Sequence, residues 1–414
     1  MSSSPPATAS SLRSDAGVIG LVSLGHLVSH FSQLFLAPLF PWLKDAFSVS
    51  YAQLGFLMTL FFVVSCAMQA VSGFLVDRYG PRNILFAGLG LIAVAAFGMS
   101  AATSYELLAL WAVVAGAGNA VFHPVDFTLL NRKVSAPRLG HAYSVHGLSG
   151  NLGWALAPAF LVPLTLAFSW RVALMAAGVF VVIVMAVLWW RRDRLDLPVS
   201  APTAQVTQVA GSEGSFAFLR IPSVWMCFMF FLLYSIVLSV VQAFAPEAAR
   251  QLHGVPLALA AACVTVYMVA SACGILLGGF LVADPQRCER IMAAGVGVAA
   301  AIALAIGFAP LPALAVPALF GAMGLATGLA GPSRDLIVKR STPDHATGRV
   351  YGVVYAGLDI GQALAAPLFG GLLDHQQYQG VWLGLFVFQG LLIFTAVNVR
   401  KVRRTAPAPV PVTP

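Results

Sequence analysis

Long, unbroken apolar stretches dominate this sequence and limit what the chain can fold into. A helix that crosses a bilayer needs about 20 mostly apolar residues. Only 9% of the residues are charged while 59% are hydrophobic, so a soluble fold could not cover the apolar surface. The stretches also lack the two-residue alternation of membrane barrels. The sequence therefore predicts an all-α membrane protein with twelve transmembrane helices, near 17–41, 51–76, 83–102, 105–130, 139–166, 170–190, 222–246, 257–283, 289–309, 312–338, 349–373 and 379–399.

One long polar connection divides the twelve stretches into two sets of six. It is rich in Pro, Ser, Gly and Thr, which is typical of a flexible linker. The C-terminal end, TAPAPVPVTP, is Pro-rich and is expected to be disordered. The predicted organisation is a cytoplasmic tail (1–16), a six-helix bundle (17–190), a cytoplasmic linker (191–220), a second six-helix bundle (221–399) and a disordered cytoplasmic tail (400–414).

The distribution of basic residues orients the helices. With the N-terminus inside, all of the 23 Lys and Arg residues except Lys44, Arg171 and Arg250 fall on or near the inner side. We therefore expect both termini in the cytoplasm of a bacterial-type cell and a multi-pass protein in its inner membrane. The same bias explains the net charge of +8, so the lipid bilayer, and no nucleic acid, is the expected surrounding.

The two halves of the chain repeat each other. The tetrapeptide GFLV of Gly73–Val76 recurs 206 residues later as Gly279–Val282. Gly116, Pro124 and Arg132 each find the same residue type 208 residues further on. Two parallel sets of six helices imply a pseudo-twofold axis along the membrane normal and a central cavity between halves that rock.

The segment around the first copy of the tetrapeptide, SGFLVDRYGPR, identifies a family. It resembles the signature loop of the major facilitator superfamily (MFS), G-x-L-x-D-R-x-G-x-R-x-x-L, and matches it at Gly73, Leu75, Asp77, Arg78, Gly80, Arg82 and Leu85. The resemblance implies the MFS fold and transport by alternating access. It also implies a gating role for the loop, with Asp77 near the positive end of a helix. We add Asp126 to the gating set, with a salt bridge to Arg78, Arg82 or Arg334. The predicted gating residues are Gly73, Asp77, Arg78, Gly80, Arg82, Asp126 and Arg334.

Two further segments, GNAVFHP (118–124) and HGLSGNLGWALAP (146–158), resemble the fosmidomycin-resistance-like exporters within that superfamily. Two positions depart from patterns of proton-coupled relatives. Ala112 occupies the place of an arginine common in the fourth helix, and Ala157 precedes Pro158 where a glycine is common in antiporters.

Ionisable residues inside a membrane are costly and mark functional sites. Asp359 lies ten residues beyond Arg349, which places it about 15 Å deep, near the middle of the bilayer. It is predicted to be either a site of protonation or substrate contact or an internal hydrogen-bonded strut. His26 and His30, one helical turn apart, are a second candidate pair for proton coupling or for hydrogen bonding to an anion.

Helical spacing places Gln33 on the face of His26 and His30, Tyr355 and Gln362 on that of Asp359, and Asn119 on a common face with His123. The predicted substrate-binding set is His26, His30, Gln33, Asn119, His123, His146, Tyr234, Gln242, Tyr355, Asp359 and Gln362, and Trp154 and Tyr267 are further candidates for the cavity wall.

No phosphate-binding loop, nucleophile motif or metal-ligand spacing is visible, so we expect no enzyme activity, no cofactor and no metal site. The expected function is proton-coupled export of a small polar or anionic compound by a monomeric transporter. Two alternatives stay open: a proton symporter that imports an organic acid or similar solute, and a transporter-like membrane sensor that binds without translocating.

Overall fold

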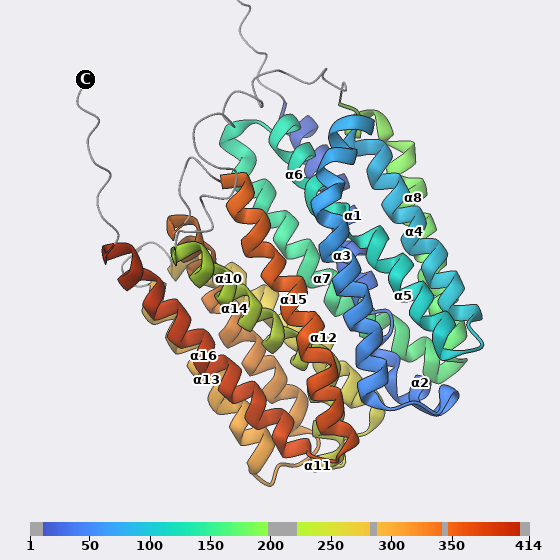
Figure 1. Ribbon diagram of the computed structural model, residues 1–414, viewed down its shortest axis with the longest axis vertical. Helices are drawn as coiled ribbons and strands as arrows, with labels where there is room; N and C mark the ends of the chain where they lie inside the picture. Colours follow the sequence, from blue (N-terminus) through green and yellow to red (C-terminus); the bar gives the residue numbers. More distant parts are fainter. Residues whose placement is uncertain (1–10, 198–221, 282–287, 342–346, 406–414) are drawn as a thin grey trace, which may run out of the picture. The chain divides into compact units, whose positions relative to one another are not determined.

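The computed structural model describes residues 11–197, 222–281, 288–341 and 347–405. Every regular element in these ranges is a helix, which confirms the predicted all-α class. Within the described residues, eleven helical segments are long and apolar enough to cross a membrane, and a shorter apolar stretch, Ala315–Gly331, lies in a further helix. Figure 1 shows these helices as long rods joined by short connections.

The first of two compact units comprises Met1–Val49 and Val63–Ala201. Helix α1 packs against α6 and α7, and α4 packs against α5 and α8. The elements of this unit, of which α3 is shared with the second unit, are α1 (Leu12–Gln33), η1 (Ala37–Leu39), α2 (Phe40–Phe47), α3 (Tyr51–Tyr79), α4 (Pro81–Ala101), α5 (Tyr105–Asn119), α6 (Phe122–Lys133), η2 (Ala136–Arg138), α7 (Leu139–Ala167), α8 (Trp170–Trp190) and η3 (Arg192–Leu195).

Local residue choices set where these helices begin. The side chains of Ser11, Ser104 and Ser169 accept hydrogen bonds from backbone N–H groups in the first turns of α1, α5 and α8. Helix α4 begins at Pro81, directly after Gly80, whose φ of 83° is a conformation that side chains with a Cβ rarely adopt. Gly80 of the signature loop is therefore required by the backbone.

The second unit comprises Ser50–Phe62 and Pro202–Pro414. Within it, α12 packs against α14, α10 against α15, and α13 against α14 and α16. The backbone N–H groups of Tyr51 and Ala52, at the start of α3, donate to the carboxylate of Asp374 at the end of α15, at 2.7 and 2.8 Å. The remaining elements of the second unit are α10 (Pro222–Ser239), the π-helical segment η6 (Val240–Phe244), α11 (Ala245–His253), α12 (Leu257–Leu281), α13 (Cys288–Phe308), α14 (Ala315–Ser341), α15 (Thr347–Asp374) and α16 (Tyr378–Thr405).

The repeat seen in the sequence extends to local backbone geometry. Ser48 directly follows α2 and Gly254 directly follows α11, and both residues are left-handed, with φ of 52° and 64°. These two positions are 206 residues apart. Before them, the first copy interrupts its helix after Gln33, whereas the second copy continues through the π segment Val240–Phe244. Each copy thus departs from regular α-helix at the same place in a different way.

Glycines allow a close helix contact in the second unit, between α12 and α14. A Cβ on Gly274 would collide with the backbone carbonyl of Leu325, and one on Gly328 would collide with that of Ser271. Small residues at such crossings let the two backbones approach each other. Close packing of this kind drives helix association in lipid, where the hydrophobic effect does not favour contact between helices.

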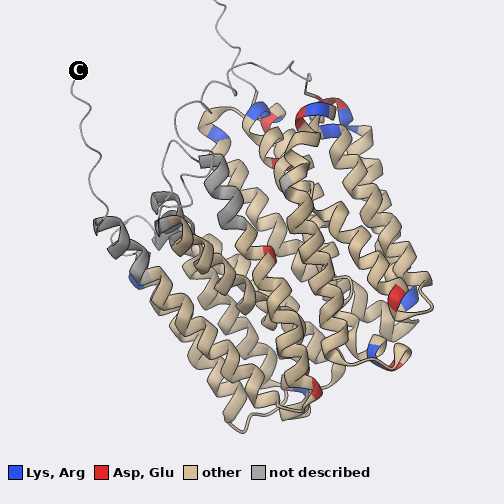
Figure 2. Ribbon diagram, in the orientation of Figure 1, with Lys and Arg blue, Asp and Glu red and all other residues tan. Residues whose placement is uncertain are grey.

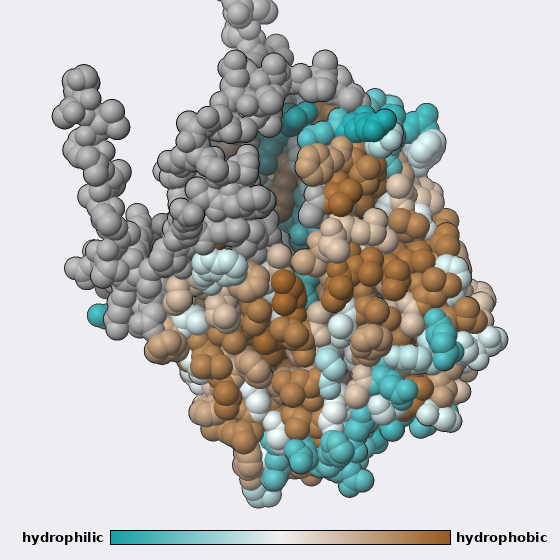
Figure 3. All heavy atoms as spheres, viewed as in Figure 1, coloured by the Kyte–Doolittle hydropathy of each residue, from teal (hydrophilic) through white to brown (hydrophobic). Residues whose placement is uncertain are grey.

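The outer surfaces of both units are apolar. Large side chains such as Phe74, Ile183 and Phe394 are more than half exposed. Figure 3 shows the apolar colours over much of the face in view, and Figure 2 shows that most charged residues lie near helix ends. This distribution fits helices whose outer faces contact lipid.

Substitution of Gly328 by Ala should destabilise the second unit, because the new methyl group has no space against the Ser271 backbone. Overpacking of this kind costs about 1–3 kcal/mol. The measurement is the temperature at which detergent-solubilised protein loses its monodisperse peak in size-exclusion chromatography. Gly390→Ala is the matched control, since nothing lies within 4 Å of its Cβ position, and an equal loss of stability in both variants would contradict the packing argument.

Candidate functional site

A cluster of five ionisable side chains lies among three helices of the first unit. We call it the His–Asp cluster: His26 and His30 on α1, His123 and Asp126 on α6, and His146 on α7. Nδ1 of His26 and Nε2 of His146 each lie 3.1 Å from the same oxygen, Oδ2 of Asp126. The ring of His26 stacks on that of His146 with centroids 3.6 Å apart. The centroids of the His26 and His30 rings are 4.4 Å apart.

Helix geometry brings these side chains together. His26 and His30 are one turn apart on α1, so both point to the same side. The break between α5 and α6 at Ala120 and Val121 begins a new helix, which carries His123 and Asp126 one turn apart. A Cβ on Gly150 of α7 would lie 2.7 Å from the His30 ring, so only glycine at this position leaves the ring its space.

The cluster is fully or largely shielded from solvent. Asp126 is 0% exposed, His26 3% and His146 6%. Within the described part of the chain, Oδ1 of Asp126 and Nδ1 of His30 have no hydrogen-bond partner. Buried polar atoms are normally paired, because an unpaired one costs roughly 1–3 kcal/mol. Two such atoms in one cluster indicate a site with unused binding capacity.

The partners of Asp126 differ from the arginines that the sequence suggested. Among the described residues, its carboxylate contacts His26 and His146, and Arg82 instead pairs with Asp196 at 3.0 Å. The reason is that α6 turns Asp126 inward between α1 and α7, which spacing along the chain could not reveal. The side chain of Arg334 lies outside the described residues, and the gating role of Asp126 stays a prediction.

A second group of polar side chains, the amide network, lies next to this cluster on α1. The Ser29 hydroxyl donates to Oδ1 of Asn119 at 2.6 Å, and the Asn119 amide donates to Ser65 at 3.0 Å. The Gln33 side-chain amide donates to Oδ1 of Asn119 at 3.5 Å. Oε1 of Gln33 accepts a 2.9 Å hydrogen bond from the indole N–H of Trp154. The network therefore links α1, α3, α5 and α7.

The structure thus brings together six residues of the predicted substrate-binding set within one unit: His26, His30, Gln33, Asn119, His123 and His146. Sequence reasoning missed Ser29, Ser65 and Gln69, the last of which accepts a 3.0 Å hydrogen bond from His123. Ser65 and Gln69 are four residues apart in an otherwise apolar stretch, and this spacing was the available signal.

The remaining candidates lie in the second unit. Asp359 and Gln362 are on α15, and Gln242 is in the π segment, which packs against α15. Asp359 is half-buried and forms no ion pair with a described residue. Gln242 and Gln362 are buried, and amide atoms of both lack a partner among the described residues. The side chain of Tyr355 lies outside the described residues.

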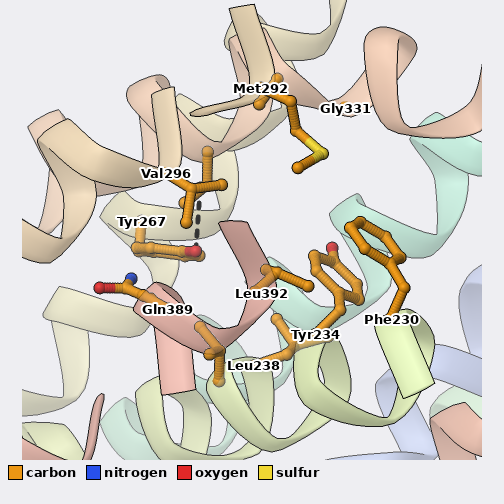
Figure 4. Close-up of a pocket in the computed structure, with 12 residues that line it drawn as sticks. Phe230, Tyr234, Leu238, Tyr267, Met292, Val296, Gly331, Gln389 and Leu392 are labelled. Carbon is orange, nitrogen blue, oxygen red and sulfur yellow. Dashed lines mark hydrogen bonds between the residues drawn. The ribbon is translucent and has the colours of Figure 1, made fainter. Parts of the chain in front are cut away.

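A small cavity lies in the second unit (Figure 4). Its volume is about 30 Å³, and its walls include Tyr234, Tyr267, Thr327 and Gln389. The hydroxyl groups of Tyr267 and Thr327 are 2.9 Å apart. This space holds about one water molecule, so it is too small for an organic substrate. Of the predicted substrate-binding residues, Tyr234 lines it.

The signature loop is at the surface of the first unit. Asp77 and Arg78 are exposed, and the Arg82 guanidinium is bound to Asp196 after η3. The expected contact between Asp77 and the start of a helix stays a prediction.

A polytopic all-helical protein with two repeated units and a polar site inside its helices has the architecture of a membrane transporter. The sequence model of the Major Facilitator Superfamily matches residues 22–322 and 290–414. The chain therefore belongs to this superfamily, as the signature loop indicated, and its relatives in fold are transporters and not enzymes.

Individual relatives share part of the sequence. The fosmidomycin resistance protein of Escherichia coli (strain K12) is 31% identical over 157 residues, 37% of each chain. The Membrane sensor protein UhpC of the same organism is 26% identical over 279 residues, 62% of each chain. The chain thus aligns with less than two thirds of the length of either protein. The 2-nitroimidazole transporter of E. coli (strain K12) is 29% identical over 346 residues, which cover 82% of this chain and 83% of that protein.

Solved structures support the fold at low sequence identity. A D-xylose-proton symporter superposes with a TM-score of 0.75 at 15% identity, over 94% of this chain and 97% of its own. A bacterial homologue of the human lysosomal transporter Spinster gives a TM-score of 0.72 at 14% identity, over 97% of this chain and 100% of its own.

Replacement of Asn119 by Ala should destabilise the first unit, because Ser29, Gln33 and Ser65 lose their common partner. A buried group left without its hydrogen bond costs about 1–3 kcal/mol. Thermal unfolding in detergent is the measurement. Asn83→Ala is the control, since Asn83 is exposed and should cost less than about 0.5 kcal/mol. Equal effects would show that the amide network adds nothing to stability.

Proposed function

We propose that this chain is a proton-coupled secondary transporter that exports a small polar or anionic compound across the inner membrane by alternating access. The observation that carries the proposal is the polar site inside the helices of the first unit. Polar and ionisable residues are rare in membrane-spanning helices, and those that face a bundle interior mark pathways for substrates and ions.

The amide network is the proposed contact surface for the substrate. Gln33 and Trp154 are only part-buried, so they combine hydrogen-bonding groups with access to a ligand. Amide and indole N–H groups donate hydrogen bonds to carbonyl, phosphonate or nitro oxygens. This donor chemistry supports a monoanion or a neutral polar molecule.

Asp359 is the proposed coupling residue. A charged carboxylate in the interior of a membrane helix is costly, and Asp359 has no ion pair with a described residue that would hold it charged. Such a group can gain and lose a proton as its hydration changes between the two faces of the membrane. Alternating access would provide that change.

The direct test uses the protein in proteoliposomes with an imposed pH gradient. Fosmidomycin and 2-nitroimidazole are the first probes, because two relatives are named for them. Movement of probe and protons in opposite directions supports export by antiport. Movement in the same direction would establish the symport alternative instead.

Asp359→Asn should reduce flux driven by the pH gradient by about tenfold or more, while exchange of probe at equal pH persists. The reason is that the amide mimics the neutral carboxyl group but cannot exchange a proton. Asp45→Asn, which removes an exposed carboxylate on α2, is the control and should retain parental flux. Full gradient-driven flux in Asp359→Asn would remove Asp359 from the coupling mechanism.

The sensor alternative has a specific observation in its favour. The similarity to UhpC proteins, named as membrane sensors, extends over 62% of the chain in one of them. Saturable probe binding without any flux, under conditions in which a known transporter reconstituted in parallel is active, would favour a sensor over a transporter.

Both termini are expected in the cytoplasm. Alkaline phosphatase fused after Arg404 should be inactive and green fluorescent protein fused there should fluoresce, because the distribution of basic residues predicts that this end is inside. A fusion after Lys44, a basic residue expected outside, is the control and should give the opposite pair of signals. Phosphatase activity after Arg404 would contradict the proposed orientation.

A further inference from the structure

The His–Asp cluster has the geometry of a metal-binding site. One ligand atom each of His26, Asp126 and His146 lies within 4.8 Å of the other two, and all three residues are buried. In a tetrahedral zinc site with bonds of about 2.0–2.1 Å, neighbouring ligand atoms are about 3.3 Å apart. The two nitrogen-to-carboxylate distances here are 3.1 Å, so the ligand atoms already have nearly this spacing.

We propose that the His–Asp cluster binds one divalent transition-metal ion through His26, Asp126 and His146. A second trio, His26, His30 and His123, also has its ligand atoms within 4.8 Å of one another. Further imidazole nitrogens therefore lie beside the first trio. Sequence spacing gave no sign of this site, because the three ligands come from α1, α6 and α7.

Two unpaired atoms provide independent support. Oδ1 of Asp126 and Nδ1 of His30 lack hydrogen-bond partners among the described residues, and the Asp126 side chain is 0% exposed. Hydrogen bonding within the cluster accounts for Oδ2 of Asp126 but not for these two atoms. A cation bound at the carboxylate would compensate its charge, which burial otherwise makes expensive.

The donor set selects the class of ligand. A carboxylate at the centre of the cluster repels anions, and two or more imidazoles favour zinc, cobalt, nickel or copper. Calcium and magnesium prefer all-oxygen sites, so the cluster should not bind them well. The ion would be either a resident part of the protein or a transported cargo, and both share this coordination chemistry.

The test is equilibrium binding of Co²⁺ and then Zn²⁺ to the purified, chelator-treated full-length protein in detergent. We expect one equivalent of Co²⁺ with visible d–d absorption of a four- or five-coordinate site, displaced by Zn²⁺ and not by Mg²⁺. Asp126→Asn and His146→Gln should each weaken binding by about 100-fold or more, since even loss of a group that only orients a ligand costs 10–100-fold.

His141→Gln is the matched control, because His141 is an exposed histidine on the same helix as His146. It should bind like the parent. Asp126→Asn is nearly isosteric, and thermal unfolding of each variant identifies folded protein. Parental affinity in both folded cluster variants, an equal loss in His141→Gln, or no binding to the parent would overturn the proposal.

Zinc flux into proteoliposomes distinguishes a transported ion from an ion that is a resident part of the protein. Flux that Asp126→Asn abolishes identifies a cargo, and tight binding without flux identifies a resident ion. Because binding is measured at equilibrium, it does not depend on the proposed transport activity. Metal binding without proton-driven probe flux would therefore contradict the proposed function and leave the metal site intact.

Discussion

The scarcity of hydrogen-bond partners in the bilayer is the constraint on which this structure depends. Every backbone N–H and C=O in the apolar segments has to be paired within the segment, which leaves helices as the solution. The same scarcity acts on side chains. A polar group such as Asn119 cannot rely on lipid, so it bonds to Ser29, Ser65 and Gln33 from neighbouring helices. The hydrogen bonds that form the polar site therefore also hold the helices of the first unit together.

The sequence predicted the helices well because the hydropathy of a stretch of residues is enough to show that it forms a membrane helix. The signature loop indicated the family, because its residues are consecutive in the chain. It also placed His26, His30, Asn119 and His123 on the faces that turn out to meet. It could not identify the partners of Asp126, since these depend on how α6 lies between α1 and α7. The orphan atoms of the cluster and the space that Gly150 leaves for His30 depend on the same packing, and no pattern along the chain records them.

The two units treat their polar residues differently although they derive from one repeat. In the first unit, Asn119 and Asp126 each bond to side chains of several helices, and Oδ1 of Asp126 and Nδ1 of His30 stay unpaired among the described residues. In the second unit, Gln242, Gln362 and Gln389 are buried and have amide atoms without partners among the described residues. Gln389 lines a cavity of about 30 Å³, where an ordered water could satisfy it. Among the described residues, hydrogen-bonded polar side chains are thus concentrated in the first unit, and Asp359 in the second has no ion pair.

The π segment Val240–Phe244 changes the direction in which the following side chains point. A π turn carries one additional residue without ending the helix, so side chains beyond it are rotated by about 100° relative to a regular α-helix. Helical hydrogen bonding thus continues from α10 into α11 while the faces of α11 are reoriented. In the first unit the helix is interrupted between α1 and α2 instead. At the same place in the repeat, one unit keeps its helix and turns its side chains, and the other ends one helix and begins another.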